Sequence, residues 1–237
     1  MKAVSINQQR MKSKMENEKQ VVDLKKSYID KTSIQSAAYK NYKSVNNISS
    51  VYRDHFQKTA KEIIFPIIHE DALRFLQFWV SVSKPKEILE LGTGFGFLAS
   101  HLLMTKSDLK ITGVDYTAEN LKIFESIVED DSIRDRYHFI EANVIYWIQQ
   151  IETQFDWVIL DVDKKFYPLL ADHIFRLVKP GGYIIADNVL WKGMVAEENL
   201  KSRVEPILKW NEMLKANHSF ESVIIPIGDG LAIGKKS

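Results

Sequence analysis

The spacing of apolar residues differs on the two sides of Pro85. Over residues 33–64 the apolar positions recur every three or four residues, which predicts an amphipathic helix packed on the rest of the protein. Its predicted apolar face consists of Ile48, Val51, Tyr52, Phe56, Ala60, Ile63 and Ile64. A second helix is predicted over residues 71–82, with a buried face made of Leu73, Leu76, Trp79 and Val80.

Beyond Pro85, short apolar runs alternate with helical stretches, which is typical of a parallel sheet with crossover helices. Strands are predicted over residues 87–91, 110–115, 136–141, 155–161 and 182–187. Helices are predicted over residues 97–105, 117–129, 143–151, 165–178 and 199–216. The last two apolar runs, 219–227 and 231–236, are joined only by Gly228-Asp229-Gly230, so they predict an antiparallel hairpin.

These elements predict an α/β fold with a doubly wound, mostly parallel, seven-stranded sheet. The sheet ends in the antiparallel C-terminal hairpin and carries an N-terminal helical extension. We divide the chain into a basic arm over residues 1–32, disordered or helical, helices that pack on the core over residues 33–84, and the α/β domain over residues 85–237.

The composition is that of a soluble globular protein, with 45% hydrophobic and 27% charged residues in 237. Every apolar run is far shorter than the roughly 20 residues that cross a bilayer, so we expect no membrane helix. The chain has no cysteine, which excludes disulfides and thiolate metal sites. The first 20 residues lack the apolar core of a secretory signal, and we therefore expect a cytoplasmic protein.

A formal net charge of +1 conceals an uneven distribution of charge. Residues 1–61 carry 13 Lys and Arg against 5 Asp and Glu, and residues 62–237 carry 19 against 26. The first segment can neutralise phosphates of a nucleic acid. It can equally be a solvated basic face that pairs with the acidic remainder or with a second subunit, because it lacks the interleaved aromatic residues of a nucleic-acid motif.

A glycine-rich turn follows the first predicted strand in the segment Glu90-Leu91-Gly92-Thr93-Gly94-Phe95-Gly96. Such a turn before a helix exposes backbone N–H groups to a ligand, although it is also a common strand-to-helix connection. Asp115, about 20 residues later, ends the second strand, where a carboxylate can accept hydrogen bonds from ribose hydroxyls. The GxGxG spacing and the acidic Glu90 favour a cationic nucleoside such as S-adenosylmethionine over NAD.

Oxygen-bearing side chains also follow the fourth and fifth predicted strands. Asp161 ends one strand, and Asp187 and Asn188 follow the next, so these side chains should lie at the same edge of the sheet. Three hard oxygen ligands suit Mg²⁺, Mn²⁺ or Ca²⁺. Each acid alone is more often a loop residue or a helix cap, and only the group together favours a metal site.

Four segments together resemble a known enzyme family. The segments are ELGTG with GVD, FDWVILDVDKKFYPLL, KPGGYIIADNVLWKG and PIGDGLAI. Over residues 60–236 the chain resembles the cation-dependent O-methyltransferases, which include catechol and caffeoyl-coenzyme A methyltransferases and bacterial relatives. The D-x-D-K and D-N-x-L-W patterns are the specific parts of this resemblance, since many methyltransferases share the glycine turn. The resemblance implies the class I methyltransferase fold, which is Rossmann-like, and a homodimer.

The resemblance also implies roles for individual residues. The divalent cation would be held by Asp161, Asp187 and Asn188. The residues implied to bind S-adenosylmethionine are Glu90, Gly92, Thr93, Gly94, Gly96, Asp115, Ala142, Asn143 and Asp163. Lys164 matches the lysine that removes a proton from the acceptor hydroxyl, whose oxygen then attacks the sulfonium methyl group.

Two departures from the family pattern concern the cofactor and the acceptor. The usual Thr-Gly-Tyr-Ser turn is replaced by Phe95-Gly96-Phe97-Leu98, which removes a serine hydroxyl expected to contact the cofactor carboxylate. Lys192 stands where the plant enzymes have a substrate-contacting Asn. We assign Trp191 and Lys192 to the acceptor site, where Trp191, Phe166 and Tyr167 are candidates to clamp a planar substrate. His69 is interpreted either as a residue above the metal or as a helix-capping or surface residue.

Three functions are compatible with the sequence. The first is methylation of a catechol-like small molecule. The second is methylation of a hydroxyuridine in transfer RNA, as some bacterial relatives do. The third is a non-catalytic cofactor- or metal-binding protein, which the combination of Lys164 with the three oxygen ligands argues against.

Overall fold

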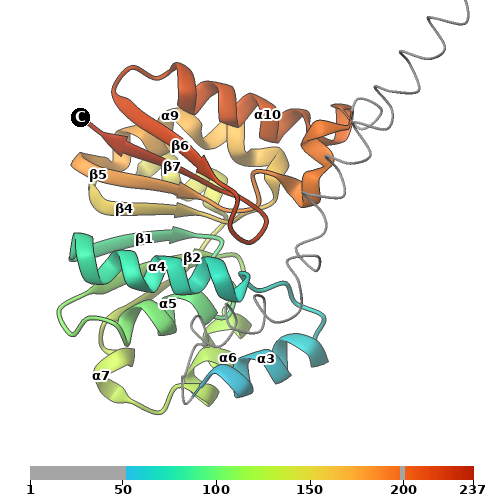
Figure 1. The fold of residues 1–237 in the computed structure, drawn as a ribbon. Helices are drawn as coiled ribbons and strands as arrows, with labels where there is room; N and C mark the ends of the chain where they lie inside the picture. Colours follow the sequence, from blue (N-terminus) through green and yellow to red (C-terminus); the bar gives the residue numbers. More distant parts are fainter. Residues whose placement is uncertain (1–51, 198–200) are drawn as a thin grey trace, which may run out of the picture. The chain divides into compact units, whose positions relative to one another are not determined.

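The computed structural model describes residues 52–197 and 201–237 (Figure 1). The chain divides into two units, Met1–Val45 and Asn46–Ser237, and all the described residues belong to the second. The predicted basic arm and the first part of the helix predicted over residues 33–64 therefore lie outside the described residues. The boundaries proposed at residues 32 and 84, and the homodimer, stay predictions.

The sheet has seven strands in the order β3-β2-β1-β4-β5-β7-β6, which confirms the predicted doubly wound topology. Strands β1 to β5 are parallel, and β7 runs antiparallel to both β5 and β6. The strands are β1 (Glu87–Leu91), β2 (Lys110–Asp115), β3 (Tyr137–Glu141), β4 (Phe155–Leu160), β5 (Val178–Ala186), β6 (Phe220–Ile225) and β7 (Leu231–Lys236).

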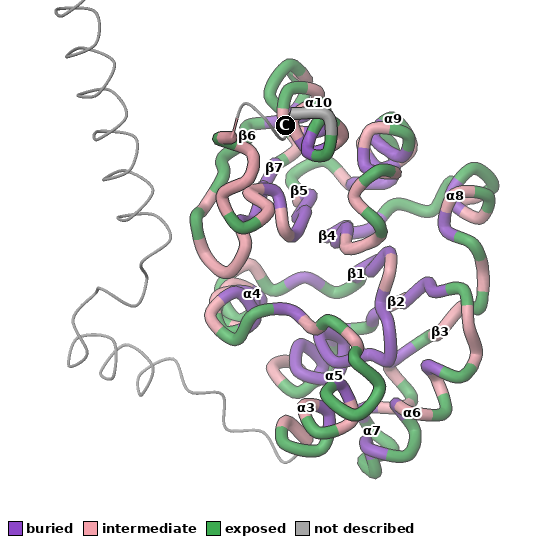
Figure 2. Tube along the Cα trace, turned by 90° about the vertical axis from the view of Figure 1, so that its right-hand side faces the viewer, coloured by how far each residue is buried: buried purple, intermediate pink, exposed green. Residues whose placement is uncertain are grey.

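Helices cover both faces of the sheet because neighbouring residues of a strand point to opposite sides (Figure 2). Ile88 of β1 packs on one face with α3 (Arg53–Glu62), α4 (Glu70–Ser83), α5 (Phe97–Leu103), α6 (Glu119–Ile127) and α7 (Asp131–Arg134). Leu89, the next residue, packs on the other face with α8 (Val144–Trp147), α9 (Tyr167–Leu177) and α10 (Lys201–Ala216). Short 3₁₀ turns complete the chain at η1 (Ile148–Gln150), η2 (Lys164–Phe166) and η3 (Trp191–Ala196).

The helix that precedes the first strand confirms most of the predicted apolar face. Leu73, Leu76 and Val80 of α4 are fully buried, and the Trp79 ring lies 5.0 Å from that of Trp157 and 4.6 Å from that of Tyr183. The helical extension therefore shares its core with the sheet. None of the helices in the described ranges is long and apolar enough to span a membrane.

Several predicted boundaries are wrong by a few residues, with physical reasons. Ile63 and Ile64 are 47% and 90% exposed because α3 ends at Glu62, and Ile64 takes a left-handed backbone with φ of 54°. Strand β5 begins at Val178, directly after α9, and not at residue 182. The helix predicted over residues 117–129 ends earlier, and Asp130 then caps the separate helix α7 by accepting a hydrogen bond from the Ser132 N–H. The helix predicted over residues 143–151 is a single turn followed by η1.

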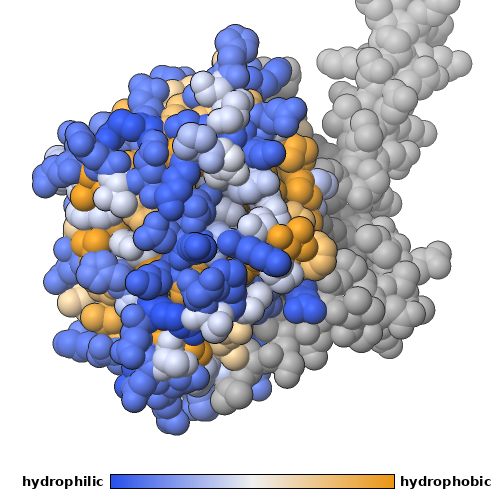
Figure 3. All heavy atoms as spheres, turned by 90° about the vertical axis from the view of Figure 1, so that its left-hand side faces the viewer, coloured by the Kyte–Doolittle hydropathy of each residue, from blue (hydrophilic) through white to orange (hydrophobic). Residues whose placement is uncertain are grey.

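The two edges of the parallel strands differ in chemistry. The strands begin at the edge seen in Figure 3, where hydrophilic side chains cover much of the surface. There Lys179 of β5 forms ion pairs of 2.9 Å with Glu87 and 3.1 Å with Asp156, which tie together the starts of β1, β4 and β5. The strands end at the opposite edge, which carries the glycine turn and the acidic residues singled out in the sequence.

Candidate functional site

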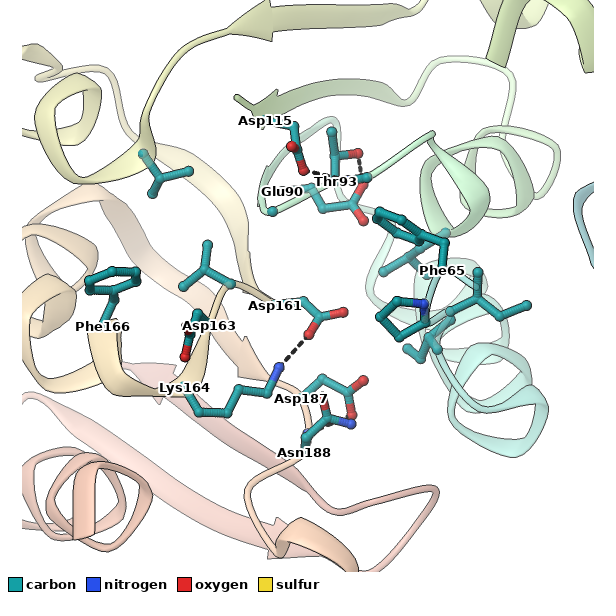
Figure 4. Close-up of a pocket in the computed structure, with 18 of the residues that line it drawn as sticks. Phe65, Glu90, Thr93, Asp115, Asp161, Asp163, Lys164, Phe166, Asp187 and Asn188 are labelled. Atoms are coloured by element: carbon teal, nitrogen blue, oxygen red, sulfur yellow. Dashed lines mark hydrogen bonds and ion pairs between the residues drawn. The ribbon is translucent and has the colours of Figure 1, made fainter. Parts of the chain in front are cut away.

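A cavity of about 720 Å³ lies at the carboxyl ends of the parallel strands. Figure 4 shows its two sides, one built on the ends of β1 and β2 and the other on the ends of β4 and β5. The structure brings nearly all the predicted site residues to this cavity. Those that line it are Glu90, Gly92, Thr93, Gly94, Asp115, Ala142, Asn143, Asp161, Asp163, Lys164, Asp187, Asn188, Trp191 and Lys192.

The glycine turn brings the backbone close to its neighbours. Gly92 has φ of +83°, and a Cβ there would lie 2.4 Å from the carbonyl oxygen of Asp161. Gly94 has φ of +53°, and its Cβ would lie 2.7 Å from the Phe65 ring. Only glycine fits both positions, since each combines a left-handed backbone with a close approach. Gly96 does not line the cavity but precedes α5 beneath the Phe124 ring, so its direct contact with a cofactor is not supported.

Asp115 holds the turn in place from the end of β2. Its carboxylate accepts hydrogen bonds of 2.8 Å from the N–H groups of both Gly94 and Tyr116. Burial raises the pKa of Asp115, and the Gly94 N–H opposes that change by stabilising the charged form. A carboxylate oxygen accepts more than one hydrogen bond, so Asp115 keeps capacity for a ligand in the cavity.

Glu90 is the most deeply buried acid on this side of the cavity, with 3% of its surface exposed. Burial, together with the charges of Asp161 and Asp115, raises its pKa to about 8, although the Thr93 hydroxyl opposes the rise by donating a 2.8 Å hydrogen bond to it. A positive ligand group would stabilise the ionised form of Glu90. This side of the cavity is therefore suited to a cation.

Two acids occupy the opposite side because the strand ladders continue past the strand ends. The Asp161 N–H donates to the Leu91 carbonyl at 2.9 Å, and the Asp187 N–H donates to the Leu160 carbonyl at 3.1 Å. Burial and the neighbouring Asp161 charge raise the pKa of Asp187 to about 7. Burial also raises the pKa of Asp161, and Lys164, whose Nζ lies 2.6 Å from Asp161 Oδ1, opposes the change.

The structure also brings the Asn188 amide beside these carboxylates (Figure 4). Asn188 has a left-handed backbone with φ of 59°, which turns the chain at the end of β5. Asp161, Asp187 and Asn188 thus present side-chain oxygens to the same part of the cavity. Across the described ranges no group of three His, Cys, Asp or Glu side chains is placed to hold a metal ion. The third candidate ligand here, Asn188, is an amide.

This chain matches a protein-family model over most of its length. The model describes the O-methyltransferase family and matches residues 41–237. The chain belongs to the O-methyltransferase family. This membership confirms the expectation of an S-adenosylmethionine-dependent O-methyltransferase and of the mostly parallel α/β methyltransferase fold.

Individual relatives of this O-methyltransferase include plant enzymes. The chain is 28% identical to caffeoyl-CoA O-methyltransferase of Populus kitakamiensis over 180 residues, which are 70% of this chain and 76% of the relative. It is 27% identical to caffeoyl-CoA O-methyltransferase 1 of Arabidopsis thaliana over 181 residues, which are 70% of each chain.

Solved structures of bacterial proteins share the fold. An O-methyltransferase from Bacillus cereus, solved in complex with SAH, has a TM-score of 0.74 at 22% identity. The aligned region covers 85% of this chain and 97% of the Bacillus cereus chain. A putative O-methyltransferase from Klebsiella pneumoniae has a TM-score of 0.75 at 19% identity, with the same coverage.

Other predicted site residues of this O-methyltransferase also have structural roles. Asp163 is 55% exposed and pairs with Lys165 at 2.8 Å, and this partner lowers the pKa of Asp163. The Asn143 side chain accepts a 3.0 Å hydrogen bond from the Ile145 N–H, which caps α8. The Ala142 N–H donates to the Asp115 carbonyl at 2.8 Å, which brings the start of α8 to the cavity.

The proposed acceptor clamp needs one correction. Tyr167 is fully buried below the cavity, where its hydroxyl donates to the Leu160 carbonyl at 2.9 Å and the Asp187 carbonyl at 3.0 Å. It therefore supports the ends of β4 and β5 and does not face an acceptor. Phe166 and Trp191 do line the cavity, and so does His69, at the N-terminus of α4.

Sequence reasoning missed two parts of the site. Phe65 and its neighbours form a wall of the cavity opposite the acids (Figure 4). Asp229 holds the loop after β5, because its carboxylate accepts from the Lys192 N–H and its carbonyl from the Leu190 N–H at 3.0 Å. The Gly228-Asp229-Gly230 turn was visible in the sequence, but its contact with a loop nearly 40 residues earlier depends on the antiparallel pairing of β5 and β7.

Proposed function

We propose that this O-methyltransferase transfers a methyl group from S-adenosylmethionine to a hydroxyl of a catechol-like small molecule, with a divalent cation in the site. The observation that carries the proposal is the Lys164–Asp161 pair beside Asp187 and Asn188, in the same cavity as the glycine turn. A proton acceptor, a set of oxygen ligands and a nucleoside turn in one cavity are the parts that methyl transfer to a phenolic oxygen needs.

The methyl donor fits the side built on β1 and β2. S-adenosylmethionine carries ribose hydroxyls, a sulfonium and an amino group, and the two acids there, Asp115 and Glu90, are both buried and short of positive partners. Asp115 would accept from the ribose hydroxyls. Glu90 would face the positive charge of the methionine end, which would favour its ionised form over the neutral one.

A divalent cation fits the side built on β4 and β5. Asp161 and Asp187 repel each other, and the Lys164 ammonium, 2.6 Å from Asp161, offsets part of their negative charge. Two carboxylates and an amide oxygen are ligands that Mg²⁺, Mn²⁺ and Ca²⁺ accept. Asp161, Asp187 and Asn188 would hold the ion, which when bound lowers the pKa of an acceptor hydroxyl.

Lys164 would take the proton from the acceptor hydroxyl. Its Nζ lies 2.6 Å from Oδ1 of Asp161, directly beside the proposed oxygen ligands. The acceptor oxygen then forms a bond to the methyl carbon, the carbon–sulfur bond breaks, and the electron pair stays on sulfur to leave S-adenosylhomocysteine. Holding the oxygen and the methyl group in line would supply about 7–11 kcal/mol of the barrier reduction.

The nature of the acceptor is argued from the shape of the site and from the relatives. Phe166 and Trp191 offer aromatic surface to a planar ring. The plant relatives are named for caffeoyl-CoA, which carries two neighbouring phenolic hydroxyls. The basic segment behind the transfer RNA hypothesis lies mostly outside the described residues, so nothing in the described structure favours RNA.

The test is methyl transfer from labelled S-adenosylmethionine to separate samples of catechol, caffeoyl-CoA and bulk transfer RNA. Each acceptor is incubated with the purified protein, with EDTA, and with EDTA followed by excess Mg²⁺. We expect label on a phenolic acceptor, loss of transfer with EDTA and recovery with the ion. Transfer that resists EDTA would contradict the cation, and label on RNA alone would replace the acceptor class.

A further inference from the structure

Tyr137 is joined to the cavity by a buried chain of side-chain hydrogen bonds. The Thr93 hydroxyl oxygen lies 2.8 Å from Oε2 of Glu90 and 2.9 Å from the hydroxyl oxygen of Tyr137. Glu90, Thr93 and Tyr137 are 3%, 5% and 8% exposed. The chain therefore runs from the start of β3 to the end of β1 with little exposed surface.

The direction of these hydrogen bonds follows from the number of protons. When a positive ligand group keeps Glu90 ionised, Thr93 donates its single hydroxyl proton to the Glu90 carboxylate. Tyr137 must then donate its own proton to the Thr93 oxygen. Burial and the nearby Glu90 charge raise the pKa of Tyr137 well above its ordinary value, so the phenol keeps the proton that this arrangement needs. Successive hydrogen bonds that run the same way strengthen one another.

Strand β2 makes room for this chain with a glycine. Gly113 pairs with Glu90 in the register of β1 and β2. A Cβ at Gly113 would lie 2.7 Å from the Tyr137 hydroxyl oxygen and 2.8 Å from Oγ1 of Thr93. The Tyr137 ring is held by Phe124, whose ring centroid is 4.5 Å away. The Tyr137 hydroxyl is therefore confined to a position from which it bonds Thr93.

Tyr137 itself does not line the cavity, whereas Thr93 and Glu90 do. The hydrogen-bonded route from Tyr137 to the cavity passes through Thr93 to the Glu90 carboxylate. We propose that Tyr137 is a positioning residue for the methyl donor: through Thr93 it holds Glu90 toward the positively charged methionine end of S-adenosylmethionine. This inference rests on the proposed donor and adds a residue from outside the cavity.

Calorimetric titration of the full chain with three ligands tests the role of Tyr137. S-adenosylmethionine carries a sulfonium and an amino group, S-adenosylhomocysteine keeps only the amino group, and methylthioadenosine has neither. We expect Tyr137→Phe to raise the Kd of the first two by about three- to tenfold, the worth of one hydrogen bond, and to leave methylthioadenosine unchanged. In a Thr93→Val background the same substitution should have no further effect on Kd.

One variant serves as the matched control. Tyr183→Phe removes a phenol hydroxyl on β5, from a residue that does not line the cavity, and should leave all three Kd values unchanged.

The outcomes distinguish the two proposals. Failure of the unaltered protein to bind S-adenosylmethionine would overturn the proposed donor, and the positioning role with it. Binding by the unaltered protein that Tyr137→Phe leaves intact would overturn the positioning role alone. The positioning role would also be overturned if Tyr137→Phe raises the Kd of methylthioadenosine by the same factor. It would be overturned as well if the full effect of Tyr137→Phe on Kd persists in the Thr93→Val background.

Discussion

Lys164 Nζ lies 2.6 Å from Oδ1 of Asp161, three residues earlier in the chain. The two side chains leave the same loop after β4, and both are only partly exposed, with 15% and 32% of their side-chain surface accessible. In this pairing the ammonium forms an ion pair with Asp161, and its charge opposes the rise in the pKa of the buried Asp187 without cancelling it. The proposed proton acceptor thus lies against the proposed oxygen ligands.

The first prediction concerns Lys164. Lys164→Ala should leave the Kd of S-adenosylmethionine within about twofold and lower kcat by about 10²–10⁴-fold, the usual worth of a general base. Calorimetry and single-turnover transfer to catechol measure the two quantities. Lys122→Met, an exposed lysine of α6 paired with Glu119, is the control and should retain kcat. Unchanged kcat in Lys164→Ala would exclude it as the base.

The second prediction concerns binding of the cation apart from catalysis. Mg²⁺ at about 100 times its Kd would stabilise the folded protein by about 2.7 kcal/mol, which raises Tm by several degrees. Asp187→Asn should abolish this rise, because it removes a negative ligand from the set. Asp172→Asn, at an exposed position of α9, should preserve it. Equal Tm shifts in both variants would place the ion elsewhere.

The third prediction concerns the pH dependence of stability through Glu90. Its pKa is about 8 in the folded protein against 4.5 ordinarily, so between these values the unfolded chain releases a proton that the folded chain retains. Stability should therefore fall as pH rises from 4.5 to 8, by at most about 1.4 kcal/mol per pH unit from this group. The raised pKa of Asp187, about 7, also makes stability fall as pH rises toward that value.

Glu90→Gln isolates the contribution of Glu90. Urea unfolding of the ligand-free protein at a series of pH values should show a shallower fall in the variant than in the unaltered protein. The difference should be absent below pH 4.5, where Glu90 is protonated in both states. An equal fall in the variant and in the unaltered protein would mean that Glu90 is ionised in the folded protein throughout this range.

The fourth prediction concerns the glycine turn. Gly92→Ala should destabilise the protein by more than the roughly 1–2 kcal/mol of a left-handed backbone, since its Cβ would also meet the Asp161 carbonyl oxygen at 2.4 Å. Gly181→Ala is a matched control, because φ there is +75° and nothing lies within 4 Å of its Cβ. Urea unfolding gives the free energy of unfolding of both variants. Equal losses of stability would show that the chain avoids the contact with the Asp161 carbonyl by a small shift that costs little free energy.

Much of the fold and of the candidate site follows from local features of the sequence. The strands were predicted because apolar runs such as residues 87–91 are short and bounded by polar or glycine residues. Gly92, Asp115, Asp161 and Asp187 were found because they follow those strands directly, and strand ends meet at one edge of a parallel sheet. Position along the chain therefore predicted position in space.

Long-range packing decided what local pattern did not. The sequence pattern placed Tyr167 beside the acceptor, but the backbone carbonyls of Leu160 and Asp187 bind its hydroxyl beneath the cavity. Ile64 has helical spacing, yet α3 stops before it.

The amino-acid sequence alone determined the order of elements, the acids and glycines at the strand ends and the O-methyltransferase resemblance, because these depend on residue type and spacing. Only the tertiary structure showed the Tyr137–Thr93–Glu90 chain, the Phe65 wall and the contact of Asp229 with the loop after β5. Each joins side chains or loops that are distant in sequence and meet only when the sheet is assembled.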